Sequence, residues 1–269
     1  MICVNSKIFR YNIKKVIKNV TGGSMFLKKQ KKKQQEVTIE ENTQIFIEDF
    51  KKLVNEGKKE SVRSVIKFMA NSIQSELLTK CMYNDRNYPE IDYMRAILNS
   101  FLLDLSFDFW QKCNIRLKVQ NTPIISCVWN HSRMIDGLIG LGEINKNPFN
   151  GISFAYNIQA VLIEPLGLVV VDNGNHSVNA AIVYDEGEII VNTVIDISEV
   201  LERYRFDGKK YVSVETNKIV NIENLKNNSE PFTYTFGLLF EMARVLKNAK
   251  MRTDICTMML IRWGGDRYG

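Results

Sequence analysis

The hydrophobic periodicity of this chain changes once, near residue 114, and this change constrains the fold more than any other feature. Residues 41–113 place apolar side chains three and four positions apart, which is typical of amphipathic helices. Residues 114–269 begin with alternating apolar and polar positions and continue with short apolar runs between turn residues, which is typical of strands. We therefore predict an α+β fold in which an N-terminal helical layer packs on a C-terminal mixed β-sheet with flanking helices.

The predicted elements follow from these patterns and from the caps and breakers at their ends. Helices are expected over residues 43–57, 61–81, 91–110, 133–141, 179–184, 198–204 and 232–250. Strands are expected over residues 115–119, 123–128, 156–164, 167–171 and 188–195, with a hairpin over 209–219. The chain thus divides into a basic extension (residues 1–40), a helical region (41–113) and a region of mixed strands and helices (114–269).

Positive charge is concentrated at the N-terminus. Residues 1–35 hold ten basic and no acidic residues, so the remaining 26 basic and 30 acidic residues leave a net charge of −4 for the rest of a chain whose total is +6. Residues 2–20 have the pattern of a basic amphipathic helix. The tail is predicted to be a flexible, dispensable extension, with Met25 as the true start. The alternative is that it contacts nucleic acid or an anionic membrane surface.

The sequence also excludes several classes of protein. Five widely spaced cysteines without a C-x-x-C pair predict free thiols in a reducing cytoplasm, and they argue against a structural zinc site. No signal peptide and no apolar run of 18 residues is present in the sequence, so no transmembrane segment is predicted. The sequence has no Walker A, nucleophile-elbow, zinc-protease or kinase motif.

The strongest local feature is the segment of residues 168–182. An apolar strand runs into the turn 172–177, with the sequence Asp-Asn-Gly-Asn-His-Ser, and then into a helix with small residues. Gly174 can adopt a positive φ and let a ligand approach the backbone. The first N–H groups of the following helix have no partners within it, and such groups bind anions, phosphate above all.

This pattern assigns roles to the residues of the turn. Gly174, Asn175 and Ser177 are the predicted ligand-binding residues, because they place backbone and side-chain donors at the start of the helix. His176 is the predicted acid–base group or phosphate donor, and Asp172 is a second catalytic candidate that would act as a base or bind a metal. The alternative for Asp172 is a plain turn residue.

The same residues resemble a known family. A strand, a turn with Gly-x-His and a helix with small residues form the signature turn of the ParB/sulfiredoxin-like superfamily, and the resemblance covers residues 169–182. It implies a ParB/sulfiredoxin-like fold for the C-terminal region and a turn that binds nucleotide phosphate. The turn has one residue more than the family pattern, and Ser177 stands where the family has an arginine. The chain is also similar to an uncharacterised bacterial family, a domain of unknown function.

A second turn repeats the arrangement. The two histidines of the chain, His131 and His176, both occur in Asn-His-Ser, and residues 129–133 again lie between an apolar strand and a helix. If both turns lie at one sheet edge, they meet in one crevice, where ligands bind in open α/β sheets. Asn130, His131 and Arg133 would then join the ligand-binding site, with Arg133 supplying the missing cation. The alternative is that both turns are helix caps and that His131 packs locally.

Two nearby residues are expected to have structural roles only. Trp129 is expected to pack in the core rather than to stack on a base, and Asp136 is expected to be a solvated surface residue.

These features predict a cytosolic bacterial protein with a nucleotide or phosphate site, whose chemistry would be phosphoryl transfer or phosphodiester hydrolysis. Its cofactor would be a nucleotide, with or without a divalent metal, and no protein metal site is predicted. The alternative is a non-enzymatic module that binds nucleic acid or another partner, in a mobile element or a phage-defence system. A third hypothesis is a dimerising scaffold, and the sequence leaves the oligomeric state open.

Overall fold

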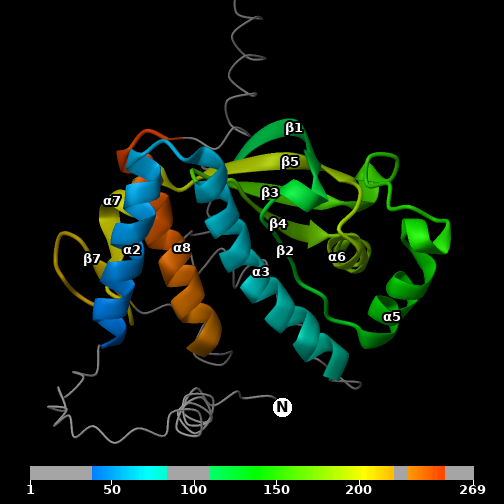
Figure 1. Ribbon diagram of the computed structural model, residues 1–269, viewed down its shortest axis with the longest axis horizontal. Helices are drawn as coiled ribbons and strands as arrows, with labels where there is room; N and C mark the ends of the chain where they lie inside the picture. Colours follow the sequence, from blue (N-terminus) through cyan, green and yellow to red (C-terminus); the bar gives the residue numbers. More distant parts are fainter. Residues whose placement is uncertain (1–37, 84–109, 221–229, 252–269) are drawn as a thin grey trace, which may run out of the picture. The chain divides into compact units, whose positions relative to one another are not determined.

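A mixed sheet organises the residues that the structure describes, which are 38–83, 110–220 and 230–251 of the computed structural model (Figure 1). Its five strands are β1 (Trp110–Lys118), β2 (Ile124–Ser126), β3 (Gln159–Glu164), β4 (Leu168–Asn173) and β5 (Glu188–Asp196). They lie in the order β1-β5-β3-β4-β2. The pairs β5–β3 and β4–β2 are parallel, and the pairs β1–β5 and β3–β4 are antiparallel. The predicted α+β class and mixed sheet are confirmed.

The helices of the described ranges are α2 (Ile39–Asn55), α3 (Lys59–Tyr83), α5 (His131–Gly140), α6 (Asn175–Tyr184), α7 (Ser198–Arg203) and α8 (Glu230–Asn248). Two short strands, β6 (Tyr204–Phe206) and β7 (Tyr211–Ser213), form a separate antiparallel pair. Helix α2 begins one turn earlier than expected because Thr38 and Glu41 form a capping box. Each side chain accepts a hydrogen bond from the backbone N–H of the other residue.

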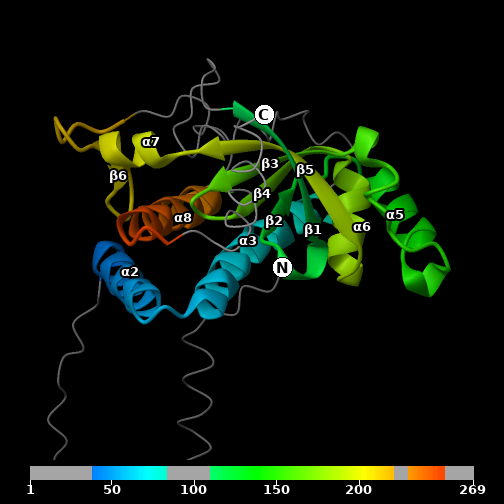
Figure 2. The same cartoon turned by 90° about the horizontal axis from the view of Figure 1, so that it is seen from above.

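Alternate side chains of the central strands enter two different cores. Val161 and Ile163 of β3 pack with residues of α2, α3 and α8, whereas Ala160 and Leu162 pack with residues of α6. Both views show α2 and α3 beside α8 (Figures 1 and 2). The helical region therefore packs on one face of the sheet and shares the first of these cores with it, as the sequence predicts. Together with α6, this leaves the sheet covered on both faces, so its strands carry the continuous apolar runs seen at residues 160–163 and 168–171.

Some element boundaries differ from the predictions. Strand β1 starts at Trp110, before the predicted boundary at residue 114, and Trp110 is the last residue of the predicted helix 91–110. The rest of that predicted helix up to residue 109 lies outside the described residues. A register shift between Lys112 and Ile115 interrupts the pairing of β1 with β5, and this hides the alternating pattern in the sequence.

The end of the predicted N-terminal extension needs correction. The extension was predicted over residues 1–40, but helix α2 begins directly after Thr38. Residues 1–37, with Met25, lie outside the described part of the chain. The predicted hairpin over 209–219 is present in part: Ser213 N donates to Lys218 O at 2.9 Å and Val220 N donates to Tyr211 O at 2.8 Å, around the bridge between Val212 and Ile219, while β7 also pairs with β6. In the described ranges, no helix has both the length and the apolar composition needed to cross a membrane.

Candidate functional site

The two Asn-His-Ser turns meet at one edge of the sheet. Strands β2 and β4 are parallel neighbours, so their carboxyl ends lie together, and each is followed by a turn and a helix. The backbone N–H of Asn130, in the first turn, donates a hydrogen bond to Nε2 of His176 in the second, at 3.2 Å. The rings of Trp129 and His176 lie edge to face, with centroids 5.3 Å apart. The predicted convergence of the turns is therefore present in the structure.

Gly174 determines the path of the chain into α6. It is the N-cap residue of this helix and has a φ of +83°, in the left-handed region. A Cβ atom at this position would lie 2.9 Å from the carbonyl oxygen of Asn157 and 3.0 Å from Cγ1 of Ile158. Both the backbone angle and the close approach require glycine. As the sequence predicts, the turn exposes backbone where a strand ends and a helix begins.

The start of α6 leaves its amides available. No side chain in the described part of the chain caps the helix, and the first backbone hydrogen bond at its start runs from Val178 N to Gly174 O, at 3.0 Å. Among the described residues, none accepts a hydrogen bond from the N–H groups of residues 175–177. These N–H groups carry partial positive charge, which the helix dipole increases.

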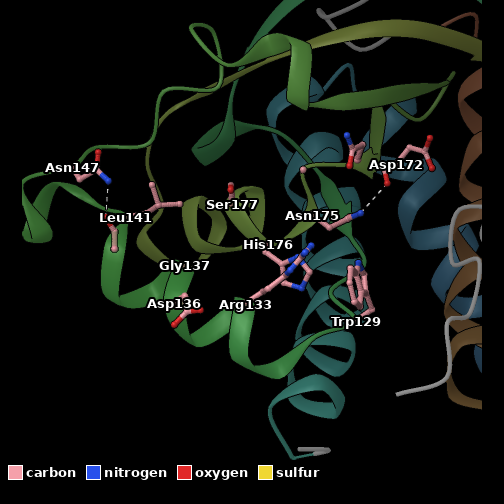
Figure 3. Close-up of a pocket in the computed structure, with 13 residues that line it drawn as sticks. Trp129, Arg133, Asp136, Gly137, Leu141, Asn147, Asp172, Asn175, His176 and Ser177 are labelled. Atoms are coloured by element: carbon pink, nitrogen blue, oxygen red, sulfur yellow. Dashed lines mark hydrogen bonds between the residues drawn. The ribbon is translucent and has the colours of Figure 1, made fainter. Parts of the chain in front are cut away.

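A cleft of about 590 Å³ opens over these amides. One wall is a single face of α5, and the other wall is the turn into α6 (Figure 3). Arg133 and His176 lie beside Trp129 at one end, and Leu141 and Asn147 lie at the other (Figure 3). The residues that line the cleft are Trp129, Arg133, Asp136, Gly137, Gly140, Leu141, Asn147, Asp172, Asn173, Gly174, Asn175, His176 and Ser177.

The charged end of the cleft is built around Trp129. The guanidinium of Arg133 lies over the indole ring, 5.1 Å from its centroid, and Trp129 is 37% exposed. The expectation that Trp129 packs in the core is therefore wrong. The reason is its position on the loop after β2, which projects beyond the sheet edge instead of continuing the buried strand. Arg133 is exposed and has no carboxylate partner within 4.0 Å among the described residues.

His176 is held as a neutral ring. A backbone N–H can only donate, so the bond from Asn130 requires an unprotonated Nε2 and places the proton of the neutral imidazole on Nδ1. Burial lowers the pKa of His176 below its usual value, and the positive charge of Arg133 lowers it further. His176 is therefore a hydrogen-bond donor through Nδ1 at neutral pH.

This geometry predicts a pH dependence of stability. A lowered pKa in the folded state means that the unfolded chain binds more protons between that pKa and the usual value of 6.5. We expect the free energy of unfolding to fall as the pH drops below about 6.5, and we expect His176→Gln to reduce this fall. Urea unfolding at pH 7.5 and pH 5 measures the effect. His131→Gln is the matched control because the chain has two histidines, and an equal loss of pH dependence in both variants would contradict the assignment.

Two predicted ligand-binding side chains are occupied by structural bonds. Oδ1 of Asn130 accepts from Arg133 N at 2.9 Å and so caps α5, as the alternative interpretation proposed. Oδ1 of Asn175 accepts from Ser126 Oγ at 2.9 Å and from Cys127 N at 2.8 Å. Its Nδ2 donates to Asp172 O at 2.9 Å. The Asn175 side chain therefore braces the turn against β2, and only its backbone N–H faces a ligand.

The remaining predicted residues divide between the cleft and the interior. Asp172, Gly174 and Ser177 line the cleft, together with Arg133. His131 does not line it, and its Nδ1 is buried without a hydrogen-bond partner among the residues that the structure describes. The shared site thus includes His176 but not the side chain of His131, because His131 begins α5 on the side away from the cleft.

A buried hydrogen-bond network fixes the turn to the sheet and to the helical layer. Asn179 of α6 donates to Ser126 O at 3.0 Å and to Asn175 O at 2.9 Å, and its Oδ1 accepts from Gln74 of α3. Gln74 in turn accepts from Ser126 N at 2.6 Å. Gln74, Ser126 and Asn179 are almost completely buried. Because unpaired buried polar groups are costly, this network holds the start of α6 in one position.

Sequence reasoning missed this network and part of the cleft wall. Asn179 and Gln74 each interrupt an apolar stripe in the sequence. Such an interruption is the signal that could have indicated a buried polar contact. The face of α5 that carries Asp136, Gly137 and Gly140 was not recognised, since small and charged residues at helical spacing are usually solvated. The described residues hold no group of three or more His, Cys, Asp or Glu side chains that would bind a metal ion.

The fold and the cleft define an α+β protein with an amide-lined pocket, holding one arginine and two aspartates, where two parallel strands end. A family model matches residues 28–253, so the chain belongs to this family, described as a family of unknown function (DUF6710). No curated protein and no solved structure matches the chain.

Proposed function

We propose that the cleft binds the phosphate group of a nucleotide or of another phosphorylated ligand. The observation that carries this proposal is the convergence of three kinds of donor on one pocket. These are the guanidinium of Arg133, the Nδ1–H of His176 and the backbone N–H groups at the start of α6. Arginine forms strong paired hydrogen bonds with phosphate, and helix N-termini favour negative charge.

The resemblance to the ParB/sulfiredoxin-like superfamily supports the same proposal. The order of strand, glycine turn, helix and strand is present as β4, Gly174, α6 and β5. Ser177 occupies the family's arginine position, and Arg133 lines the same cleft from the opposite wall. A cation reaching the phosphate from α5 would replace the family's cation from α6.

The chemistry that we propose for the cleft is phosphoryl transfer or phosphodiester hydrolysis, with His176 as the phosphate donor, the second of its two expected roles. His176 already accepts a bond at Nε2, so it suits donation to a phosphate oxygen better than removal of a proton. Asp172 also lines the cleft and is the candidate for the general base. A divalent metal would arrive with the nucleotide, since phosphate oxygens supply ligands of their own.

A thermal-shift titration tests phosphate binding. At a ligand concentration of about one hundred times Kd, binding adds about 2.7 kcal/mol to stability, so Tm of the wild type should rise by about 5 °C or more with inorganic phosphate or a nucleotide. Arg133→Ala and His176→Ala should remove most of this rise. Arg133→Ala should leave Tm without ligand nearly unchanged, whereas His176→Ala should lower it slightly, because Asn130 N loses its acceptor. Arg203→Ala, at the exposed C-terminal residue of α7, is the control and should respond like the wild type.

The same titration separates the alternative function. A nucleic-acid-binding module would place its contacts in the basic residues 1–35, outside the described residues. Binding through this tail would be unaffected by Arg133→Ala or His176→Ala. A ligand response that survives in both variants would therefore reject the cleft and favour the tail.

A further inference from the structure

We propose that the ligand carries hydroxyl groups next to its phosphate, as a phosphorylated sugar does alone or within a nucleotide, and that Asp136 accepts their hydrogen bonds. This inference rests on the proposed phosphate site and names the class of ligand that it takes. It concerns a carboxylate that the phosphate site itself does not use.

Arg133 and Asp136 lie one turn apart on the face of α5 that forms the cleft wall. Elsewhere in the molecule, opposite charges three positions apart on a helix do pair. Lys52 and Asp49 are 2.7 Å apart, and so are Arg244 and Glu241. Arg133 and Asp136 form no such pair, because the guanidinium lies over Trp129 instead. The order of the two charges along the helix also favours pairing less.

Asp136 therefore remains without a partner inside a pocket. Among the described residues, no hydrogen bond or ion pair reaches its carboxylate, and the side chain is exposed. An ionised carboxylate can only accept hydrogen bonds, so it would repel a phosphate and attract a donor. The cleft thus has a phosphate-binding end at Arg133 and a donor-binding position about 4.5 Å further along the helix axis, given a rise of 1.5 Å per residue.

The neighbouring wall has open space at Gly140. This residue follows Asp136 on the same face, and a Cβ atom there would meet nothing within 4 Å, whereas a Cβ atom at Gly137 would lie 3.6 Å from the carbonyl oxygen of His176 in α6. Leu141 adds an apolar surface at the far end of the cleft (Figure 3). A sugar ring has an apolar face of C–H groups and an edge of hydroxyls. This chemistry matches a wall of glycine and leucine beside a carboxylate that accepts hydrogen bonds.

Isothermal titration calorimetry of the full chain with inorganic phosphate, ribose 5-phosphate and phosphoethanolamine tests the inference. We expect ribose 5-phosphate to bind about tenfold or more tightly than inorganic phosphate, the gain typical of a hydrogen bond to a charged acceptor. Asp136→Asn should remove most of this gain and leave binding of inorganic phosphate equal or slightly tighter. Asp185→Asn, outside this cleft on the C-terminal end of α6, is the control and should retain the full gain.

The outcomes separate this inference from the phosphate site. If neither inorganic phosphate nor ribose 5-phosphate binds, the phosphate site itself fails, and this inference fails with it. If phosphate binds but the sugar adds nothing, or if Asp136→Asn keeps the gain, only the inference about hydroxyl groups is overturned. A larger gain for phosphoethanolamine than for ribose 5-phosphate would also overturn it, because Asp136 would then recognise an ammonium group.

Discussion

Replacing Asn179 by leucine is expected to lower the free energy of unfolding by about 3 kcal/mol. Asn179 is completely buried and bonds to Gln74, Ser126 and Asn175. A leucine would leave the amide of Gln74 and two carbonyl oxygens without these partners in the interior. Urea denaturation at pH 7 measures the change. The variant should also bind phosphate more weakly, because Asn175 begins the helix whose amides face the ligand.

The control for this variant is Asn55→Leu at the exposed end of α2. It changes the same chemical groups without touching the network, and we expect a change in stability within about 0.5 kcal/mol. Equal unfolding free energies for the two variants would show that the buried bonds contribute nothing beyond the change of residue type. A folded Asn179→Leu variant with normal phosphate binding would show that the network does not position the turn.

Replacing Gly174 by alanine is expected to cost about 3 kcal/mol of stability and to disrupt the cleft. The left-handed backbone angle alone costs an alanine about 1–2 kcal/mol. The new Cβ would also lie 2.9 Å from the carbonyl oxygen of Asn157, so the backbone of one of the two segments must shift. Chemical denaturation gives the loss of stability. The phosphate titration of the same variant then reports whether the amides of α6 still point into the cleft.

Gly140→Ala provides the matched glycine control. Gly140 also lines the cleft, but its φ is not positive and its Cβ would meet no atom within 4 Å. An alanine there should be neutral or stabilise α5 by a few tenths of a kcal/mol up to about 1 kcal/mol. If Gly174→Ala were as harmless as Gly140→Ala, the left-handed turn would not be needed for the entry into α6.

The predicted local elements agree with the structure where one segment carries its own signal. The amphipathic stripe of α3, the apolar strand β4 and the glycine after it are all visible in the sequence, because periodicity and turn chemistry act over a few neighbouring residues. The start of β1 at Trp110 was missed, since its pairing with β5 contains a register shift that only the partner strand explains.

The candidate site was only partly predictable for a related reason. The two Asn-His-Ser turns were found as a repeated pattern, and the parallel pairing of β2 with β4 brings them together. The pattern alone does not distinguish a side chain that faces the cleft from one that faces the interior. Asn175 therefore looked like a ligand-binding residue, although its side chain braces the turn, and His131 looked equivalent to His176, although it does not line the cleft.

The sequence by itself determined the α+β class, the helical layer and the glycine turn that opens α6, because each depends on hydrogen bonds and burial within a short stretch of chain. The tertiary structure alone decided which donors share one cleft and which polar residues are buried as its support. Strand order and helix packing join residues 74, 126, 133, 176 and 179 across more than one hundred positions, and contacts over such separations leave no periodic trace in the sequence.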